Sequence, residues 1–588
     1  MDEQVEVLIV GGGSAGLTAS MLLVRLGVDA LLVSAQAETS RLPKAHVLNQ
    51  RAMEIMRDCG TSEDIYAIGT PPEAMSHTAY YAGFAGHADA GRLLFKQESW
   101  GAGGMDEDWA AASPMVASNL PQIRLEPVLK RHAEQTSPGR VRFHHEVLSI
   151  DDDGTGVTAS VADHSTGAEY RVRARYLVAC DGGRTIGRQV GVALEGVTDL
   201  TRMASVYMSA DLSSFIGDPD VLLRWVFSPE IGGMITLAPM GPTRWGGESE
   251  EWVVHLGYRS GDERANDDAA VMADLRIGLG IADHPIDVHL ISRWSIGGVV
   301  ADRFRVGRVF VLGDAAHRHP PTGALGLTSA MHDAHNLCWK LALVVRGVAG
   351  DALLDTYHDE RRPVDARNVQ RSLENAHGHG LIGRVLGTSD PKLSIDERWR
   401  NLARMWGESH DDVALRRQVI SMMAAQSQEF HEHDVEYGYT HRSSAVVPDG
   451  SPEPEPHDFR YFVPSTRPGS PLPHAWLEDE SFRRLSTLDL VSVGQFVLIA
   501  GEEGGAWCAA ARAVADELGI DLRAVAVGHS TGDLRDPRLR WQRVREFGPQ
   551  GAVLVRPDRC VAWRSIGAAD DAAAVLRSVL RQLLSVPT

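Results

Sequence analysis

A strand, a glycine-rich turn and a helix follow one another within residues 5–27, and this succession restricts the fold more than any other part of the chain. The run VEVLIV (5–10) is apolar and rich in β-branched residues, which predicts a strand buried on both faces of a parallel sheet. GGGSAG (11–16) fits the pattern GxGxxG, and LTASMLLVRLG (17–27) has the apolar spacing of a helix that ends at glycine. The chain therefore predicts an α/β domain with a nucleotide-binding turn.

Each position of this turn has a physical role in holding a dinucleotide. Gly11 permits the tight turn, Gly13 lets the backbone approach a pyrophosphate, and Gly16 allows close packing of helix on strand. Ser14 and Ala15 begin the helix, whose N–H groups and dipole would face the phosphates. The alternative is a glycine-rich turn that only precedes a core helix.

Two features concern the rest of such a ligand. An acidic residue at the end of the second strand usually binds the ribose, but LLVSAQ offers Ser34, with Glu38 as an alternative. Two later strands, in YLVACDGG and RVFVLGDAAH, end in Asp181 and Asp314. These carboxylates are expected at the carboxyl edge of the sheet, where ligands bind, although Asp-Gly is also an ordinary turn sequence.

The run from Gly313 contains four histidines within a short span, which raises the possibility of a metal site. His317 and His319 alternate about a strand end, and His332 and His335 lie about a turn apart on the next helix. No HExxH motif or cysteine pair supports metal binding. We therefore expect no metal, and packed or surface imidazoles instead.

The 588 residues are too many for one core and divide into four predicted segments. Residues 1–190 with 296–375 form the α/β domain, and residues 191–295 predict a mostly antiparallel sheet inserted into it. Residues 376–445 are predicted to be helical. A proline-rich linker then leads into a C-terminal α/β domain, so that 446–588 form the last segment.

Composition limits the possible partners. The net charge of -20 argues against a nucleic-acid or anionic-membrane surface. The five cysteines are far apart and form no CxxC, which is typical of a reduced protein without disulfides. No signal peptide or long apolar run is evident, so we expect a cytoplasmic protein without a membrane segment.

As a set, the motifs resemble the group A flavoprotein aromatic hydroxylases, which have the para-hydroxybenzoate hydroxylase fold. The similarity covers residues 5–375 through GxGxxG, the DG strand end, GDAAHRHPP and DAHNLCWKL, and extends to IRLEPVLKRHA and LLDTYHDERRPV. PKAHVLNQRAMEIMRDCG and RWVFSPEIGG are most similar to the 2,4-dichlorophenol 6-monooxygenase and phenol hydroxylase subgroup. The region around RPGSPLPHAWL resembles their thioredoxin-like C-terminal domain. Without CxxC, this domain implies interaction, oligomerisation or simple stabilisation rather than redox chemistry.

The resemblance implies FAD as cofactor, held at the histidine-rich run and at the matching positions elsewhere. The complete predicted set is Gly11, Gly13, Ser14, Ala15, Gly16, Ser34, Lys44, Gln122, Leu148, Asp181, Asp314, Pro321, Gly326, Leu327 and Thr328. The chain departs from the family where Lys44 replaces an arginine, Ala324 and Leu325 stand within the usual GGxG, and Thr328 replaces an asparagine. These departures imply an altered flavin environment.

The implied reaction is hydroxylation of a phenol or hydroxypyridine ortho to its hydroxyl, with NAD(P)H as transient reductant and O2 converted to a flavin C4a-hydroperoxide. His46 is the predicted proton acceptor, or else a structural histidine at a helix start. Arg293 or Arg224 could stabilise a phenolate, or both are ordinary surface charges. Five apolar residues are predicted either to line the substrate side or to be core: Trp225, Phe227, Met234, Ile235 and Met240. The alternatives are an FAD oxidase, a Baeyer–Villiger-type oxygenase and a flavin-binding accessory protein. A homo-oligomer is expected.

Overall fold

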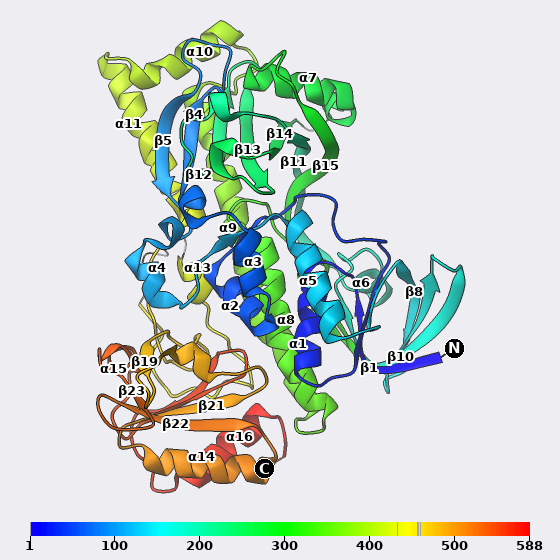
Figure 1. The fold of residues 1–588 in the computed structure, drawn as a ribbon, viewed down its shortest axis with the longest axis vertical. Coiled ribbons are helices and arrows are strands. Elements are labelled where there is room, and N and C mark those ends of the chain that lie inside the picture. Colours follow the sequence, from blue (N-terminus) through cyan, green and yellow to red (C-terminus); the bar gives the residue numbers. More distant parts are fainter. Residues whose placement is uncertain (1, 260, 432, 456–457, 459, 588) are drawn as a thin grey trace.

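The computed structural model describes residues 2–259, 261–431, 433–455, 458 and 460–587, and arranges them around three large sheets (Figure 1). The first sheet belongs to the N-terminal part of the chain, the second lies above it in the figure, and the third forms the C-terminal domain. This arrangement confirms the predicted α/β class.

The first sheet has the strand order β16-β17-β10-β1-β2-β7, and the pairs from β17 to β7 are parallel. Residues Val7, Leu8 and Ile9 of β1 are fully buried, as the apolar run predicts. The strands are β1 (Asp2–Val10), β2 (Ala30–Ser34), β7 (Val141–Phe143), β8 (His145–Asp152), β9 (Val157–Asp163), β10 (Ala168–Ala179), β16 (Arg305–Val306) and β17 (Val309–Val311). The β8–β9 hairpin joins the sheet through β9, which pairs antiparallel with the first part of β10.

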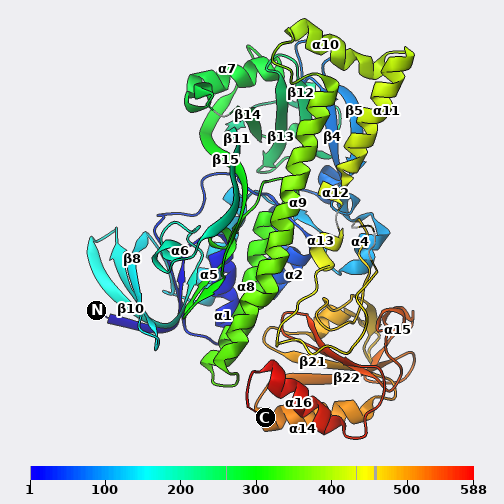
Figure 2. The same ribbon diagram turned by 180° about the vertical axis from the view of Figure 1, so that it is seen from behind.

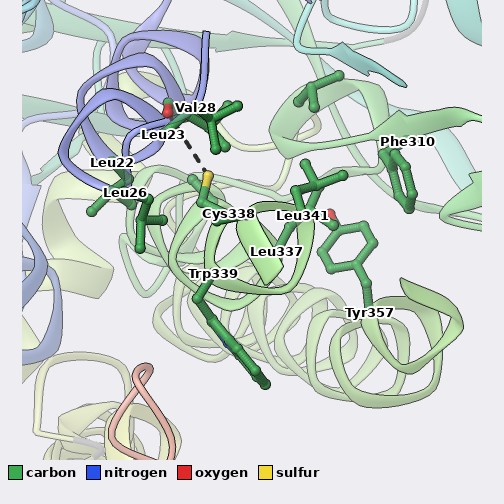
Figure 3. Packing of buried hydrophobic residues seen from close by; sticks show 14 of the residues in the cluster. Leu22, Leu23, Leu26, Val28, Phe310, Leu337, Cys338, Trp339, Leu341 and Tyr357 are labelled. Atoms are coloured by element: carbon green, nitrogen blue, oxygen red, sulfur yellow. Dashed lines mark hydrogen bonds between the residues drawn. The ribbon is translucent and has the colours of Figure 1, made fainter. Parts of the chain in front are cut away.

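Helices cover this sheet, and α1 (Ser14–Arg25) packs against α8 (Leu325–Val345). Figure 3 shows Cys338 of α8 turned towards Leu22 and Leu23, where its thiol contacts the Ala19 carbonyl, while Trp339 points the opposite way. The remaining elements of this part are α2 (Gln50–Cys59), α3 (Ser62–Ile68), α4 (Glu107–Ala112), α5 (Gln122–Thr136), α6 (Ile186–Gln189), β3 (Val47–Leu48) and β6 (Ser118–Asn119). Because α8 is buried on nearly all of its sides, it lies at the centre of the molecule.

The second sheet is wider than the predicted segment 191–295. Its order is β18-β15-β11-β14-β13-β12-β4-β5, so that strands from both sides of the segment complete it. They are β4 (His77–Ala82), β5 (Arg92–Glu98), β11 (Leu194–Ser209), β12 (Val221–Ser228), β13 (Gly233–Gly241), β14 (Glu251–Tyr258), β15 (Asp287–Ala301) and β18 (His317–Arg318). Only the β12–β4 pair is parallel among the pairs of described strands in this sheet. Helix α7 (Asp268–Leu279) covers its outer face.

The predicted boundary at residue 375 falls inside α9 (Thr356–Leu386), which runs without a break from the first domain along the second sheet (Figure 2). The helical segment continues as α10 (Ile395–Ala403), α11 (His410–Ala425), α12 (Ser427–Phe430) and α13 (His433–Tyr437). One long helix therefore connects the two sheets, and the helical segment covers the edge formed by β4 and β5.

The C-terminal domain contains β21 and β22 as a parallel βαβ unit, followed by β24 and β25 as an antiparallel pair. The order β22-β21-β24-β25 is that of a thioredoxin-like sheet, with α14 and α16 packed together on one face. Its elements are β19 (Trp476–Glu478), β20 (Arg484–Ser486), β21 (Phe496–Gly501), α14 (Gly505–Leu518), β22 (Leu522–Gly528), β23 (Leu534–Arg535), α15 (Arg540–Val544), β24 (Ala552–Val555), β25 (Val561–Ser565) and α16 (Ala572–Leu583).

Among the described helices, none has a stretch both long and apolar enough to cross a bilayer.

Candidate active site

The three glycine-containing motifs, far apart in sequence, meet at one edge of the first sheet. A Cβ on Gly11 would lie 2.3 Å from the Cys180 carbonyl oxygen, so the first turn touches the strand that ends in Asp181. A Cβ on Gly313 would lie 3.2 Å from Cβ of Ala15, so the Gly-Asp turn touches the start of α1. The Arg318 guanidinium donates to the Gly182 carbonyl at 2.7 Å and joins the second motif to the third. The three motifs therefore lie together at this edge of the sheet.

The first turn has the geometry that its glycines predict. Gly11 has φ +119°, and a Cβ on Gly16 would lie 1.9 Å from the Gly11 carbonyl oxygen, which no side chain could tolerate. Helix α1 starts without a side-chain cap at Gly13. The dipole of α1 makes this end of the helix positive, as phosphate binding requires, and the Ser14 N–H is bonded to Glu126.

Glu126, which the sequence reading missed, supports this turn from α5. Its Oε1 accepts the Ser14 N–H at 3.1 Å and the Gln122 side chain at 2.5 Å, and its Oε2 accepts the Ser40 N–H at 2.8 Å. A buried carboxylate thus fixes Ser14 and Gln122 together. The only sequence signal was an acidic residue on the buried face of an amphipathic helix.

The other predicted cofactor residues differ in their exposure and in their hydrogen bonds. Asp181 is half-buried and accepts N–H bonds from Gly183, Thr185 and Ile186, while Asp314 is exposed. Ser34 is buried beside Gly12, whereas Glu38 is exposed and bonded to Lys130.

Two further predicted residues, Lys44 and Leu148, lie at the protein surface. Lys44 is exposed with φ 43°, and Leu148 is exposed on β8 with its carbonyl bonded to Gln189.

The loop 320–326 leads from β18 into the N-terminus of α8. Pro321 is exposed, and Ala324, with φ 54°, directs the chain into α8, which begins at Leu325. Leu327 and Thr328 are buried in the first turn of α8, and the Thr328 hydroxyl donates to the Leu325 carbonyl at 2.9 Å. The helix N-terminus would stabilise negative charge beside Gly326.

These features fit FAD. The N-terminus of α1 can receive a pyrophosphate, because half-buried Gly11 and Gly13 carry no side chain to obstruct a ligand, while Glu126 accepts the Ser14 N–H. The exposed Asp314 carboxylate can accept hydrogen bonds from hydroxyl groups, and α8 provides a second helix N-terminus. Gly11–Gly16, Gln122, Asp181, Asp314 and the 320–326 loop would hold the cofactor, which supplies the redox chemistry.

His46 directly precedes β3 and has one defined tautomer. Its Nδ1 is 2.5 Å from Asn119 Oδ1, and the Asn119 amide nitrogen donates to the Thr70 hydroxyl at 2.6 Å. Because this arrangement leaves the Asn119 oxygen facing His46, Nδ1 carries the proton and Nε2 keeps its lone pair. Burial lowers the pKa of His46 despite the hydrogen bond with Asn119, so the imidazole is a neutral base at neutral pH.

A second histidine, His255, lies near His46 on the inner face of the second sheet. His255 Nδ1 is 2.6 Å from the Ser205 hydroxyl, which also accepts the Trp294 indole N–H at 2.8 Å. Burial, and then the nearby His46, lower the pKa of His255 to about 4. The site thus contains two neutral imidazoles.

The second sheet places only some of the predicted substrate residues near this site. Trp225, Phe227 and Met234 belong to one apolar cluster with Val47 and Ala324 on the inner face. Met240 joins a smaller cluster with Tyr207. Ile235 packs instead on the outer face, where its side chain lies against Gly278 of α7. Strand alternation requires this result, because Met234 and Ile235 are consecutive.

The two candidate arginines bind other parts of the protein. Arg293 donates to the Ala265 carbonyl and pairs with Asp268 on the exposed outer side. Arg224 is buried, but its guanidinium donates to the carbonyls of Val221 and Asp218. Neither guanidinium faces the inner surface of the sheet, so neither is carried forward as a phenolate-stabilising group.

The helical segment contributes a dyad that the sequence reading also missed. Glu429 Oε2 lies 2.5 Å from His379 Nε2, and its Oε1 accepts the Gly323 N–H at 3.1 Å. The Trp225 ring stacks on the His379 ring with centroids 4.0 Å apart. The dyad therefore connects the 320–326 loop with the aromatic wall of the second sheet, a contact between residues too distant in sequence to show a motif.

The histidine-rich run forms an ion-pair network rather than four converging histidines. His317 Nε2 lies 2.7 Å from Asp333, and Arg361 donates to Asp333 at 2.9 Å and to Asp365 at 2.8 Å. Asp333 also accepts the Gly313 N–H at 3.1 Å, which fixes the turn that carries Asp314. His332 and His335 point elsewhere on α8. His317, Asp333 and Asp365 could together reach a cation, but Arg361 already supplies the positive charge.

The same network predicts a pH dependence of stability. Burial raises the pKa of Asp365 to about 7, and Asp333 adds to this effect against Arg361. A carboxyl whose pKa rises on folding destabilises the protein increasingly as pH climbs from its unfolded value near 4 to 7. Asp365→Asn, which cannot ionise, should therefore gain thermal stability relative to the parent across this window, by at most about 1.4 kcal/mol per pH unit. Parallel melting curves of the two proteins between pH 5 and pH 8, recorded at constant ionic strength, would contradict this assignment.

Comparison with known proteins agrees with the geometry. Residues 4–372 match the family model described as FAD binding domain, and residues 465–587 match that of the aromatic-ring hydroxylase C-terminal domain. The 2,4-dichlorophenol 6-monooxygenase of Delftia acidovorans is 37% identical over 593 residues, covering 99% of this chain and 98% of the relative. The phenol 2-monooxygenase of Pseudomonas sp. (strain EST1001) is 34% identical over 586 residues, covering 98% and 92%.

A solved structure agrees as well. The crystal structure of the flavin-dependent monooxygenase PieE in complex with FAD and substrate is similar with a TM-score of 0.91 at 38% identity, covering 99% of both chains. Since both halves of the chain match and the relatives extend over its full length, the chain belongs to the family of FAD-dependent aromatic-ring hydroxylases.

Proposed function

We propose that the protein is an NAD(P)H-consuming, FAD-dependent monooxygenase that hydroxylates a phenol or hydroxypyridine ortho to its hydroxyl. The observation that supports this most is His46, a neutral imidazole with a free Nε2 lone pair, directly before Val47 in the aromatic cluster of Trp225 and Phe227. The relatives named for a chlorophenol and for phenol support the substrate class. O2 is the proposed co-substrate.

The residues divide the work between binding and proton transfer. Trp225 and Phe227 would hold the ring by apolar contact, and Trp225 Nε1, buried without a partner among the described residues, is free to donate to a substrate oxygen. His46 would accept the phenolic proton at Nε2, because an ionised hydroxyl makes the ortho carbon more electron-rich. Bound FAD would supply reduction by NAD(P)H and activation of O2. The apolar wall would keep water from the reacting atoms.

His46→Ala should lower kcat by at least about 100-fold at neutral pH, because proton transfer by a positioned base contributes that much. The loss should shrink as pH approaches the pKa of the substrate, and it should be small for a nitrophenol that is already ionised. Turnover and FAD content are measured together. His132→Ala is the matched control, because it removes a partly exposed histidine of α5 that is bonded to Asp64 of α3. Equal activity of the His46 variant at every pH, or a loss that follows FAD content, would exclude this role.

The requirement for an ionisable hydroxyl gives a test of the substrate class. Phenols should stimulate NAD(P)H oxidation and their methyl ethers should not, although both rings fit the apolar wall. Stimulation by ethers as strong as that by phenols would argue against phenol hydroxylation.

We also propose that the protein acts in the cytoplasm as a homo-oligomer. All five cysteines are free thiols, four of them buried, which suits a reducing compartment. Light scattering after gel filtration measures the number of subunits.

A further inference from the structure

A small cavity lies where α2, α8 and α9 meet the chain that enters the C-terminal domain. None of its lining residues belongs to the predicted FAD-binding set. All eight side chains that line it are polar, and five are arginine or histidine: Arg51, Arg361, His332, His335 and His441. A cavity of this kind is not part of an apolar core, because polar groups without partners are costly to bury.

Three nitrogen atoms of these side chains are buried without a partner among the residues that the structure describes: Arg51 Nε, His332 Nε2 and His441 Nδ1. The Arg51 guanidinium is held in place, since Nη1 bonds Glu54 at 2.5 Å and Nη2 bonds the Asp558 carbonyl at 2.7 Å. Its Nε–H is therefore a fixed donor with no acceptor. Such orphaned donors are rare in folded proteins and indicate an occupant.

The groups that line the cavity favour an electron-rich occupant, while both lining arginines are also paired with carboxylates outside it. Asp558 is the only acid lining the cavity, and both carboxylate oxygens are already engaged, Oδ1 by Arg556 at 3.0 Å and Oδ2 by Asn336 at 3.2 Å. Burial lowers the pKa of His332 well below its usual value, and Arg361 and Arg51 add to this effect as cations. Among the described residues, the lining atoms that are buried without a partner are all nitrogens.

We propose that this cavity binds one monovalent halide ion, such as chloride, held by hydrogen bonds from Arg51 Nε, His332 Nε2 and His441 Nδ1. Each neutral imidazole can carry its proton on the nitrogen that faces the ion. The ion would connect α2 and α8 to the segment containing Tyr439 and His441, and so fasten the C-terminal domain to the FAD-binding domain. The cavity is small, so one monatomic ion fits it better than a polyatomic sulfate or phosphate.

The first test uses the FAD-loaded protein. Its melting temperature is measured in sodium chloride and sodium bromide against sodium gluconate at the same ionic strength. Because the ion binds only the folded state, chloride and bromide should give a saturable rise of about 2 °C. Identical melting temperatures in all three salts would overturn the proposal and leave a water molecule as occupant.

The second test assigns the effect to the cavity. His441→Leu should abolish the halide-dependent rise. His474→Leu should keep it, because His474 is also a buried histidine with an unpartnered nitrogen but lies outside the cavity. If the His441 variant does not fold, bromide-soaked crystals of the unaltered protein decide. An anomalous peak among the three nitrogens supports the site, and density without anomalous signal there refutes it.

Discussion

Replacing Glu360 with alanine is expected to destabilise the folded protein by about 3–5 kcal/mol, because it leaves the buried Lys340 without its anion and Arg556 with Asp558 alone. Glu360 is 1% exposed and accepts bonds from Arg556 at 2.6 and 2.9 Å and from Lys340 at 2.8 Å. Burial lowers the pKa of Lys340 to about 8, although Glu360 opposes the shift. Without Glu360, this pKa should fall further.

The same carboxylate connects α9 to the C-terminal domain through Arg556, so the damage should concentrate at that contact. Thermal unfolding and limited proteolysis of the linker after residue 446 measure both effects. Glu374→Ala is the control, since Glu374 is an exposed residue of the same helix and its surface pairing is worth at most about 1 kcal/mol. Similar melting temperatures for the two variants would show that the buried network contributes little.

Gly16→Ala is expected to abolish FAD binding. Since a Cβ at this position would lie 1.9 Å from the Gly11 carbonyl oxygen, α1 must move away from the strand and the phosphate-binding N–H groups must move with it. The purified variant should be colourless, and added FAD should not restore flavin absorbance or activity.

Gly505→Ala serves as the matched control, because Gly505 also begins a helix and its Cβ would meet no atom within 4 Å. This variant should retain its flavin in full. A yellow Gly16 variant with unchanged FAD affinity would show that the close contact is not required for cofactor binding.

The sequence was informative where local pattern and chemistry coincide. The apolar run of β1 and the glycines that follow it predict a strand, a turn and a helix, because each feature depends on neighbouring residues. The two later strand ends, at Asp181 and Asp314, reach the same sheet edge because parallel strands share one direction.

Residues that act through long-range contacts were not predictable in the same way. Glu126, His379 and Glu429 reach the site from segments with no motif of their own, and only the packing of α5, α9 and α12 brings them there. Ile235 shows a different error, because it was predicted with Met234 although consecutive strand residues face opposite sides. The alternation of side chains along a strand places Met234 and Ile235 on opposite faces of the sheet.

The central claim is that this FAD-binding site inserts one atom of O2 into a phenol. The most direct measurement supplies isotopically labelled O2 to the FAD-loaded protein with NAD(P)H and a series of phenols and hydroxypyridines, and records product mass and peroxide. We predict a product that carries one labelled oxygen, formed in step with NAD(P)H consumption. Consumption that yields only labelled peroxide with every ring tested, or a product whose new oxygen comes from water, would contradict the account.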